Sequence, residues 1–141
     1  MKPQILLLHG YLQNGEKIKK SFTKLMGKTY CNNYEIISPD GVYSIDNLEN
    51  QYGWWNLPFK EIFCQPHKYN IEGFFEYFEK LLKNYQNLKQ VYGFSQGAVA
   101  LTLLISNDVI VVISVLVIGG TKSIPKYFRI KSFKYIIIII F

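Results

Sequence analysis

Residues 90–98 read Gln-Val-Tyr-Gly-Phe-Ser-Gln-Gly-Ala, and this stretch decides how the chain folds. Its first five residues predict a strand, and the apolar residues after it predict a buried helix over Ala98–Ile105. Between them lies a Gly-x-Ser-x-Gly motif, which is typical of a sharp strand-to-helix turn that holds a serine clear of the sheet. A serine in this strained turn crowds the positions two before and two after it, where glycine relieves the clash. The motif therefore predicts a nucleophilic Ser95, with structural roles for Gly93 and Gly97.

The helix after Ser95 adds a second chemical feature. The first N–H groups of a helix have no partner inside the helix and carry partial positive charge. The backbone N–H of Gln96 is therefore a candidate donor to the oxyanion that forms when a serine attacks a carbonyl group.

Outward from this motif, strands alternate with helices. Strands are expected at Gln4–Leu8, Tyr34–Ser38, Gln90–Phe94, Val111–Ile118 and Tyr135–Phe141, and helices at Lys17–Lys28, Ile71–Tyr85 and Ala98–Ile105. This alternation predicts an α/β fold with a doubly wound, mostly parallel sheet. From Val42 to Asn70 no period holds, and a loop of that length in a small domain is often functional.

Composition narrows the class of protein. The chain has 141 residues, of which 49% are hydrophobic, so one domain over residues 1–141 with an ample core is expected. Its apolar stretches are too short for a membrane span, which needs about 20 residues, and Ile5–Leu8 is too short for a signal peptide. These features predict a soluble protein of the cytoplasm, and also of the nucleus, with two free thiols at Cys31 and Cys64.

The net charge of +6 lies mostly near the C-terminus. Residues 1–95 carry 11 lysines against 9 acidic residues, whereas residues 96–141 carry 5 basic residues against the single acidic residue Asp108. No nucleic-acid-binding module accompanies this basic segment, which is interpreted as a solvated loop between two strands. We therefore expect no nucleic acid partner.

His9-Gly10 directly follows the first predicted strand. One interpretation makes His9 a catalytic base, but in hydrolases with this serine motif the base follows the serine in the chain. The loop is better interpreted as the source of a second oxyanion donor, either the N–H of Tyr11 or that of Leu12. In this interpretation Gly10 lets the backbone approach closely, and His9 has a structural role.

Gly53-Trp54-Trp55 lies in the long segment without a period. Two functions are open for Trp54 and Trp55: they line the pocket of an apolar substrate, or they pack this segment onto the sheet. His67, in the same segment, is interpreted as a surface histidine.

Three motifs occur together: Leu-Leu-His-Gly-Tyr-Leu-Gln-Asn at 7–14, Gly-Trp-Trp at 53–55 and Gly-Phe-Ser-Gln-Gly-Ala at 93–98. In order and spacing they resemble the FSH-type serine hydrolase family, which includes the fungal family-of-serine-hydrolases proteins and the animal ovarian-tumour-suppressor-candidate-2 esterases. The serine motif alone is also similar to acyl-protein thioesterases and small carboxylesterases. The resemblance implies an α/β-hydrolase fold without metal or diffusible cofactor. It also implies hydrolysis of carboxylic esters, or thioesters, of small or lipid-like acyl substrates through an acyl-enzyme on Ser95.

The resemblance further implies a catalytic acid and a histidine after Ser95. Residues 96–141 contain no His, no Glu and one Asp, Asp108, which comes before the strand that the family's acid follows. Neither catalytic partner has a matching position, so we expect the chain to represent about the first two-thirds of such a hydrolase. The alternative function is a catalytically dead fragment of the hydrolase fold that acts as a binding module.

Overall fold

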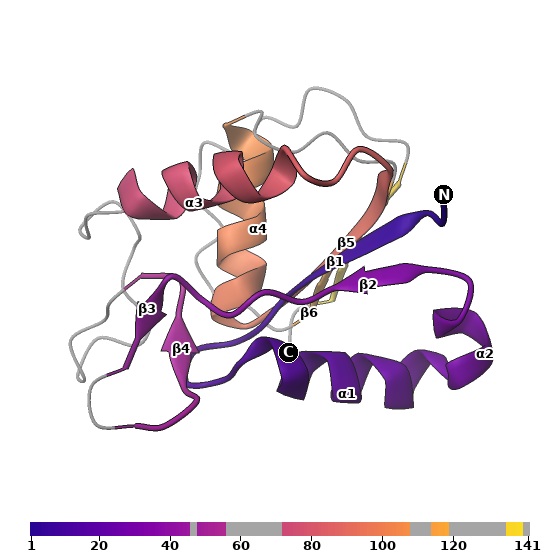
Figure 1. Cartoon of the computed structure of the whole chain (residues 1–141), viewed down its shortest axis with the longest axis horizontal. Helices are drawn as coiled ribbons and strands as arrows, with labels where there is room; N and C mark the ends of the chain where they lie inside the picture. Colours follow the sequence, from indigo (N-terminus) through magenta and orange to yellow (C-terminus); the bar gives the residue numbers. More distant parts are fainter. Residues whose placement is uncertain (46–47, 56–71, 108–113, 119–134, 140–141) are drawn as a thin grey trace.

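A parallel sheet forms the centre of the molecule (Figure 1). The computed structural model describes residues 1–45, 48–55, 72–107, 114–118 and 135–139. Within these ranges, five strands pair in the order β2-β1-β5-β6-β7, and neighbouring strands are parallel. They are β1 (Gln4–Leu8), β2 (Glu35–Ile37), β5 (Leu88–Phe94), β6 (Ser114–Ile118) and β7 (Tyr135–Ile139). The predicted α/β fold with a doubly wound parallel sheet is confirmed.

Helices cover both faces of this sheet. α1 (Gly15–Met26) and α2 (Lys28–Cys31) lie on one face, and α3 (Glu72–Leu82) and α4 (Gln96–Ser106) lie on the other (Figure 1). The chain thus passes across one face between β1 and β2 and across the opposite face between β5 and β6, which is how a doubly wound sheet buries both of its sides.

β1 is buried on both faces, which explains its unbroken apolar sequence. Leu6 and Leu8 belong to the cluster that includes the residues of α3 and α4, whereas Ile5 and Leu7 pack with Phe22 of α1. All four of these residues are fully buried. The alternation follows from the two-residue period of a strand.

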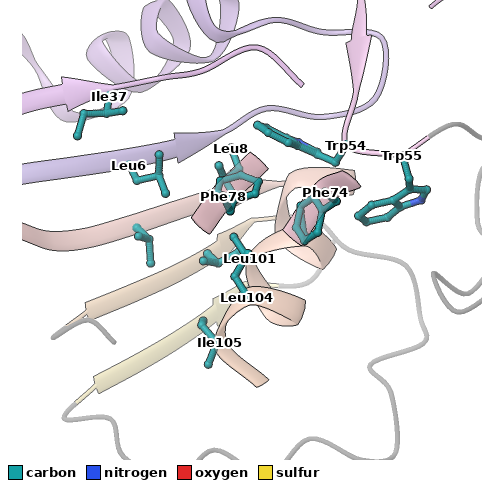
Figure 2. Packing of buried hydrophobic residues seen from close by; sticks show 12 residues of the cluster. Leu6, Leu8, Ile37, Trp54, Trp55, Phe74, Phe78, Leu101, Leu104 and Ile105 are labelled. Carbon is teal, nitrogen blue, oxygen red and sulfur yellow. The ribbon is translucent and has the colours of Figure 1, made fainter. Parts of the chain in front are cut away.

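The larger of the two hydrophobic clusters lies between the sheet and helices α3 and α4 (Figure 2). Phe74 and Phe78 of α3 and Leu101 and Leu104 of α4 supply much of its volume. Trp54 and Trp55 close the end of the cluster toward which β1 points (Figure 2). The cluster therefore extends to the edge of the sheet where the predicted site residues lie.

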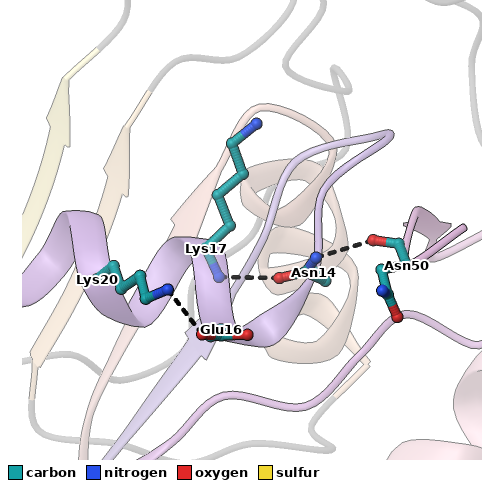
Figure 3. Close-up of polar contacts among 5 residues, drawn as sticks. All are labelled: Asn14, Glu16, Lys17, Lys20 and Asn50. Carbon is teal, nitrogen blue, oxygen red and sulfur yellow. Dashed lines mark hydrogen bonds and ion pairs between the residues drawn. The ribbon is translucent and has the colours of Figure 1, made fainter.

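α1 begins two residues before the predicted start because Asn14 caps it (Figure 3). The side-chain Oδ1 of Asn14 accepts a hydrogen bond from the N–H of Lys17 at 2.8 Å, and its Nδ2 donates to the carbonyl of Asn50 at 2.8 Å. Glu16 and Lys20 form an exposed ion pair of 2.7 Å on the same helix. Gly27, with a φ of 84°, separates α1 from α2, so the predicted helix 17–28 ends earlier than expected.

The predicted irregular segment contains a short antiparallel ribbon of β3 (Tyr43–Ser44) and β4 (Tyr52–Gly53). Strands of this length are too short to produce a recognisable period, so the sequence pattern does not reveal them. Residues 46–47 and 56–70 of this segment, and with them His67 and Cys64, lie outside the described residues.

β1 has the predicted bounds, the other predicted elements occur with shifted ends, and the expected strand residues 111–113 and 140–141 lie outside the described ranges. In the predicted helix 17–28, the helical period places Ile18, Phe22, Leu25 and Met26 on one apolar side, but Leu25 is 67% exposed. Phe22 fills the contact between α1 and the sheet, edge-on to Tyr92 with ring centroids 4.7 Å apart. Among the described helices, none is long and apolar enough to cross a membrane.

Candidate active site

The sheet order places two loops side by side. β2 and β5 flank β1 on opposite sides, so the winding direction reverses between β1 and β5. In open parallel sheets, ligands bind at the carboxyl ends of the strands at such a reversal. The loop after β1 contains His9–Gln13 and the turn after β5 contains Ser95, so both sequence motifs lie at this position.

Ser95 lies in a sharp turn between β5 and α4. Its backbone has a φ of 52° and a ψ of −117°, a combination that non-glycine residues rarely adopt. Such a conformation costs about 1–3 kcal/mol and is found mostly at functional sites. Ser95 is the N-cap residue of α4, yet its side chain makes no capping hydrogen bond, so its hydroxyl is not used to stabilise the helix.

Close backbone packing requires glycine on both sides of Ser95. A Cβ atom on Gly93 would lie 2.5 Å from the carbonyl oxygen of Gly97, and a Cβ atom on Gly97 would overlap the carbonyl oxygen of Leu8. The turn after β5 is therefore in direct backbone contact with the end of β1.

The loop after β1 forms a tight turn over Gly10–Gln13. The N–H of Gln13 donates to the carbonyl of Gly10 at 3.1 Å, and the N–H of Gly10 donates to the side-chain Oε1 of Gln13 at 3.0 Å. A Cβ atom on Gly10 would lie 3.1 Å from the ring of Phe94 and 3.3 Å from the Cβ of Ser95. The turn is therefore packed against Ser95, and glycine at position 10 permits that approach.

The two alternative donors from this turn differ in their surroundings. Leu12 has a φ of 63°, in the left-handed region, and its N–H donates to the carbonyl of Tyr52 at 3.0 Å. The N–H of Leu12 is therefore already paired with residue 52. The phenol of Tyr11 stays neutral at physiological pH, since burial raises its pKa above the ordinary value of 10.0.

His9 is fully buried behind the turn. Its Nε2 accepts a hydrogen bond from the N–H of Gly41 at 2.8 Å, so its Nδ1 carries the proton and donates to the carbonyl of Gly10 at 2.7 Å. Burial lowers the pKa of His9 below the ordinary value of 6.5, although the Gly10 carbonyl and Asp40 act in the opposite direction. His9 is therefore a neutral side chain with both ring nitrogens bonded to backbone, an arrangement that suits structural support and not proton transfer.

Trp54 and Trp55 are packed in the core. The Nε1 of Trp54 donates to the carbonyl of His9 at 2.8 Å, and its ring centroid lies 4.9 Å from that of His9 and 5.3 Å from that of Phe78. Trp55 is 2% exposed and contacts Phe74 edge-on, with ring centroids 5.9 Å apart (Figure 2). Of the two functions open from the sequence, this geometry favours packing.

Two glutamine side chains at the site were missed by the sequence interpretation, which assigned only the backbone N–H of Gln96 and gave Gln13 no role. Gln96 is buried, and its Oε1 accepts the N–H of Trp54 at 2.9 Å while its Nε2 donates to the carbonyl of Trp55 at 3.3 Å. The sequence signal for these two side chains was an amide within each of the two loop motifs. An amide alone does not identify the group to which it bonds.

An apolar cavity of about 250 Å³ lies between α1 and the carboxyl-terminal halves of β1 and β5. Its wall includes Gly93 and Phe94, the two residues before Ser95, together with Gln13 of the neighbouring turn. The remaining lining residues are Leu7, Ile18, Ser21, Phe22, Leu25 and Tyr92. Phe94 is 41% exposed, so this wall reaches solvent next to Ser95. Within the described ranges, no three His, Cys, Asp or Glu side chains gather as a metal site.

The fold is that of the α/β-hydrolases, as solved structures show. The chain is similar to a carboxylesterase from Bacillus cereus, with 15% identity and a TM-score of 0.66, covering 99% of this chain and 63% of that one. It is similar to esterase PE8, with 16% identity and a TM-score of 0.67, covering 99% of this chain and 68% of that one. The acyl-protein thioesterase 2 of Zea mays matches with 19% identity and a TM-score of 0.52, over 84% of this chain and 57% of that one.

Sequence comparison gives the family. Residues 1–109 match the model of the family described as serine hydrolase (FSH1), and the chain belongs to this family. The resemblance of the three motifs is thereby confirmed. The chain spans 63% of the length of the Bacillus cereus enzyme. A comparison with curated protein sequences gives no match.

Proposed function

We propose that this chain hydrolyses carboxylic esters through an acyl-enzyme formed on Ser95. The observation that carries the proposal is the strained backbone of Ser95, held between two glycines and packed against the Gly10–Gln13 turn. Strain of this kind persists where the surrounding structure enforces it, as at active sites. Membership of the serine hydrolase family over residues 1–109 supports the reaction class.

In the proposed reaction, the Oγ of Ser95 attacks the carbonyl carbon of the ester, and the carbonyl electron pair moves onto its oxygen. The N–H groups of Gln96 and Tyr11 donate to that oxyanion. The bond to the alcohol oxygen then breaks, and the alcohol leaves with the proton from Ser95, while the acyl group stays on the serine. Water attacks the acyl carbon, releases the carboxylic acid and restores the hydroxyl. A thioester reacts in the same way, with a thiol as the leaving group.

The substrate class that we propose is an ester with an apolar acyl group. The apolar cavity beside Phe94 supports this class because its wall begins at the residue before Ser95. Its volume of about 250 Å³ lies just below the range of about 300–1,000 Å³ typical of small-molecule sites, which suits a short acyl chain. Since Trp54 and Trp55 are buried in the core, we assign the acyl group to this cavity.

A second candidate function is a binding module that holds an acyl ligand without turnover. One observation favours it: His9, the histidine among the described residues, has backbone partners on both ring nitrogens. A serine hydroxyl without an adjacent base is a weak nucleophile. In this alternative, the cavity and the N–H groups bind a ligand, and Ser95 does not react.

Labelling with a fluorophosphonate separates the two functions. If Ser95 is an activated nucleophile, peptide mass spectrometry finds one phosphonyl group on Ser95, and Ser95→Ala abolishes both labelling and hydrolysis of p-nitrophenyl butyrate. The control variant Ser44→Ala, which removes an exposed hydroxyl in β3, is labelled like the parent. A folded chain that is not labelled contradicts the esterase and supports the binding module.

We further propose the cytoplasm as the compartment. The thiol of Cys31 is free and buried, which supports a reducing environment. Recovery of a tagged chain in the secreted fraction of its cells would contradict this proposal.

A further inference from the structure

Two glutamine side chains hold backbone groups close to Ser95, and the proposed reaction uses neither. The Oε1 of Gln13 accepts the N–H of Gly10, at 3.0 Å, within a turn that its own backbone hydrogen bond already closes. The Oε1 of Gln96 accepts the N–H of Trp54 at 2.9 Å, and its Nε2 donates to the carbonyl of Trp55 at 3.3 Å. Each glutamine therefore fixes a loop that the backbone alone would leave less constrained.

The two glutamines are joined through Tyr52 of β4. The N–H of Tyr52 donates to the carbonyl of Gln13 at 2.9 Å, and the carbonyl of Tyr52 accepts the N–H of Leu12 at 3.0 Å. Trp54 and Trp55, which Gln96 holds, follow Tyr52 by two and three residues. A continuous path of hydrogen bonds and short chain segments thus runs from the Gly10–Gln13 turn through residues 52–55 to Gln96.

This path begins and ends beside Ser95. Gly10 contacts Ser95 directly, since a Cβ atom on Gly10 would lie 3.3 Å from the Cβ of Ser95. Gln96 is the residue after Ser95 and the first residue of α4. The ring of contacts therefore fixes the turn that contains Tyr11 relative to the start of α4.

We propose that the side chains of Gln13 and Gln96 are positioning residues that set the spacing between the N–H groups of Tyr11 and Gln96, so that both donate to one oxyanion. The inference rests on the proposed function of Ser95. Oxyanion donors act when they lie about 2.7–3.1 Å from the developing charge. A displacement of about 1 Å in such a site costs about 100-fold in rate, so a side chain that constrains Gly10, the residue before Tyr11, affects the reaction.

The two side chains supply different hydrogen-bonding groups, which makes the inference testable. In its contact with Gly10, Gln13 acts only as an acceptor, so the carboxylate of Glu can replace its amide. Gln96 acts as acceptor and donor at once, in a buried position. A carboxylate at position 96 would face the carbonyl of Trp55 without a proton to donate, and it would be a buried charge.

The test compares the variants Gln13→Glu, Gln13→Met, Gln96→Glu and Gln96→Met by the second-order rate constant of fluorophosphonate labelling at Ser95. We expect Gln13→Met, Gln96→Glu and Gln96→Met to fall by about 10-fold to 100-fold, and Gln13→Glu, which keeps the acceptor, to lose less than Gln13→Met. Hydrolysis of p-nitrophenyl butyrate should show the loss in kcat with little change in KM. The control Gln86→Met, at an exposed glutamine between α3 and β5, should match the parent.

A merely structural role predicts a different result. It lowers the Tm of Gln13→Met and Gln96→Met but leaves the labelling rate of the folded fraction unchanged, and that result overturns the inference. Equal losses in Gln13→Glu and Gln13→Met also overturn it, because the acceptor would then not matter.

Amide hydrogen exchange separates this inference from the proposed function. In the parent, the N–H groups of Gly10 and Trp54 should be protected, and Gln13→Met and Gln96→Met should each speed exchange at its own partner. If the parent is not labelled at Ser95, the proposed function fails, and the positioning role fails with it even where both protections are found. If the parent is labelled but neither N–H is protected, only the positioning role fails.

Discussion

The turn after β5 and the turn after β1 both lie against Ser95, but they are held by different means. The first depends on the absence of side chains: Gly93 lets the turn pack against the backbone of Gly97, and Gly97 lets it pack against the carbonyl of Leu8. The second depends on hydrogen bonds that reach across the fold, since the side chain of His9 bonds to Gly41 and the backbone N–H of Leu12 bonds to the carbonyl of Tyr52. The first turn is therefore rigid by close backbone packing, and the second is only as rigid as the hydrogen bonds to its distant partners.

The difference predicts where the site tolerates change. An overlap of atoms in a closely packed backbone is relieved only when the backbone itself moves, whereas a lost hydrogen bond costs about 0.5–1.5 kcal/mol. We therefore expect substitutions around Ser95 to affect the fold, and substitutions around Gly10–Gln13 to affect mainly the geometry of the site.

The largest effect is expected from Gly97→Ala, which disrupts the turn after β5. The added Cβ overlaps the carbonyl of Leu8, so the free energy of unfolding should fall by about 3 kcal/mol or more. Urea denaturation measures this change. In the control Gly73→Ala, the new Cβ meets only the hydroxyl of Tyr43, at 3.3 Å, and the change should stay below about 1 kcal/mol. Equal stability of both variants would refute the close packing.

The next largest effect is a pH dependence of the free energy of unfolding, which arises from His9 at the turn after β1. Burial lowers the pKa of His9 in the folded state below its ordinary value of 6.5, so the unfolded state binds the proton more readily. The stability due to neutral His9 is complete above pH 6.5 and is lost as the pH falls from there toward the lowered pKa. One proton limits the slope to about 1.4 kcal/mol per pH unit.

This dependence is measured by urea unfolding at several pH values in the parent and in His9→Asn and His67→Asn. We expect His9→Asn to flatten the acid side of the profile and His67→Asn to leave it unchanged. Because the N–H of Gly41 donates to His9, the amide of Gly41 should lose its protection from exchange as the pH falls, before the amides of the Ser95 turn lose theirs. The reverse order would show that the two turns do not differ as proposed.

A smaller effect concerns the strain at Ser95 itself. Glycine adopts a φ of 52° with a ψ of −117° far more easily than any other residue. Ser95→Gly should therefore exceed Ser95→Ala in free energy of unfolding by about 1 kcal/mol, and both variants should lose labelling. Thermal unfolding compares the pair directly. No difference between them would mean that the turn is unstrained in solution.

The smallest effect is expected at Leu12, the other strained residue of the site, with a φ of 63°. Leu12→Gly should stabilise the chain by about 0.5 kcal/mol, because relief of the left-handed backbone exceeds the entropy that glycine loses. The labelling of Ser95 should persist. Leu48→Gly is the control, at an exposed leucine outside the positive-φ residues, and it should give no gain. A loss of stability in Leu12→Gly would place its side chain among the residues that hold the turn.

The parts of the fold that were predictable from sequence depend on local patterns. The buried strand Gln4–Leu8 has the predicted ends because all four apolar residues lie on a strand covered on both faces. The glycine at 93 was predictable because the clash that it avoids, with the backbone of Gly97, arises within the same turn, whereas the glycine at 97 also avoids the carbonyl of Leu8 in a distant segment. Leu25 was misplaced because the helical period assigns a face, but not how far the neighbouring sheet extends beneath it.

The contacts that were not predictable join residues far apart in the chain. The bond between Gln96 and Trp54 spans 42 residues, and that between His9 and Gly41 spans 32. No pattern in either segment names the partner, since an amide or an imidazole bonds equally well to any backbone group placed beside it. The burial of Trp54 likewise depends on α3 and α4, and these helices lie beside Trp54 only when the whole sheet has formed.

The pairing of β1 with β5 also determines when Ser95 can acquire its geometry. Gln4 bonds to Asn87 across 83 residues, so the two strands that flank the site close one of the longest loops in the described structure. Contacts of such separation form late in folding, because the entropy of closing the loop is lost before the contacts stabilise it. During synthesis, β1 is made early, and its packing stays incomplete until β5 has been made. A chain that displays Ser95 in its strained turn is therefore a chain that has already folded.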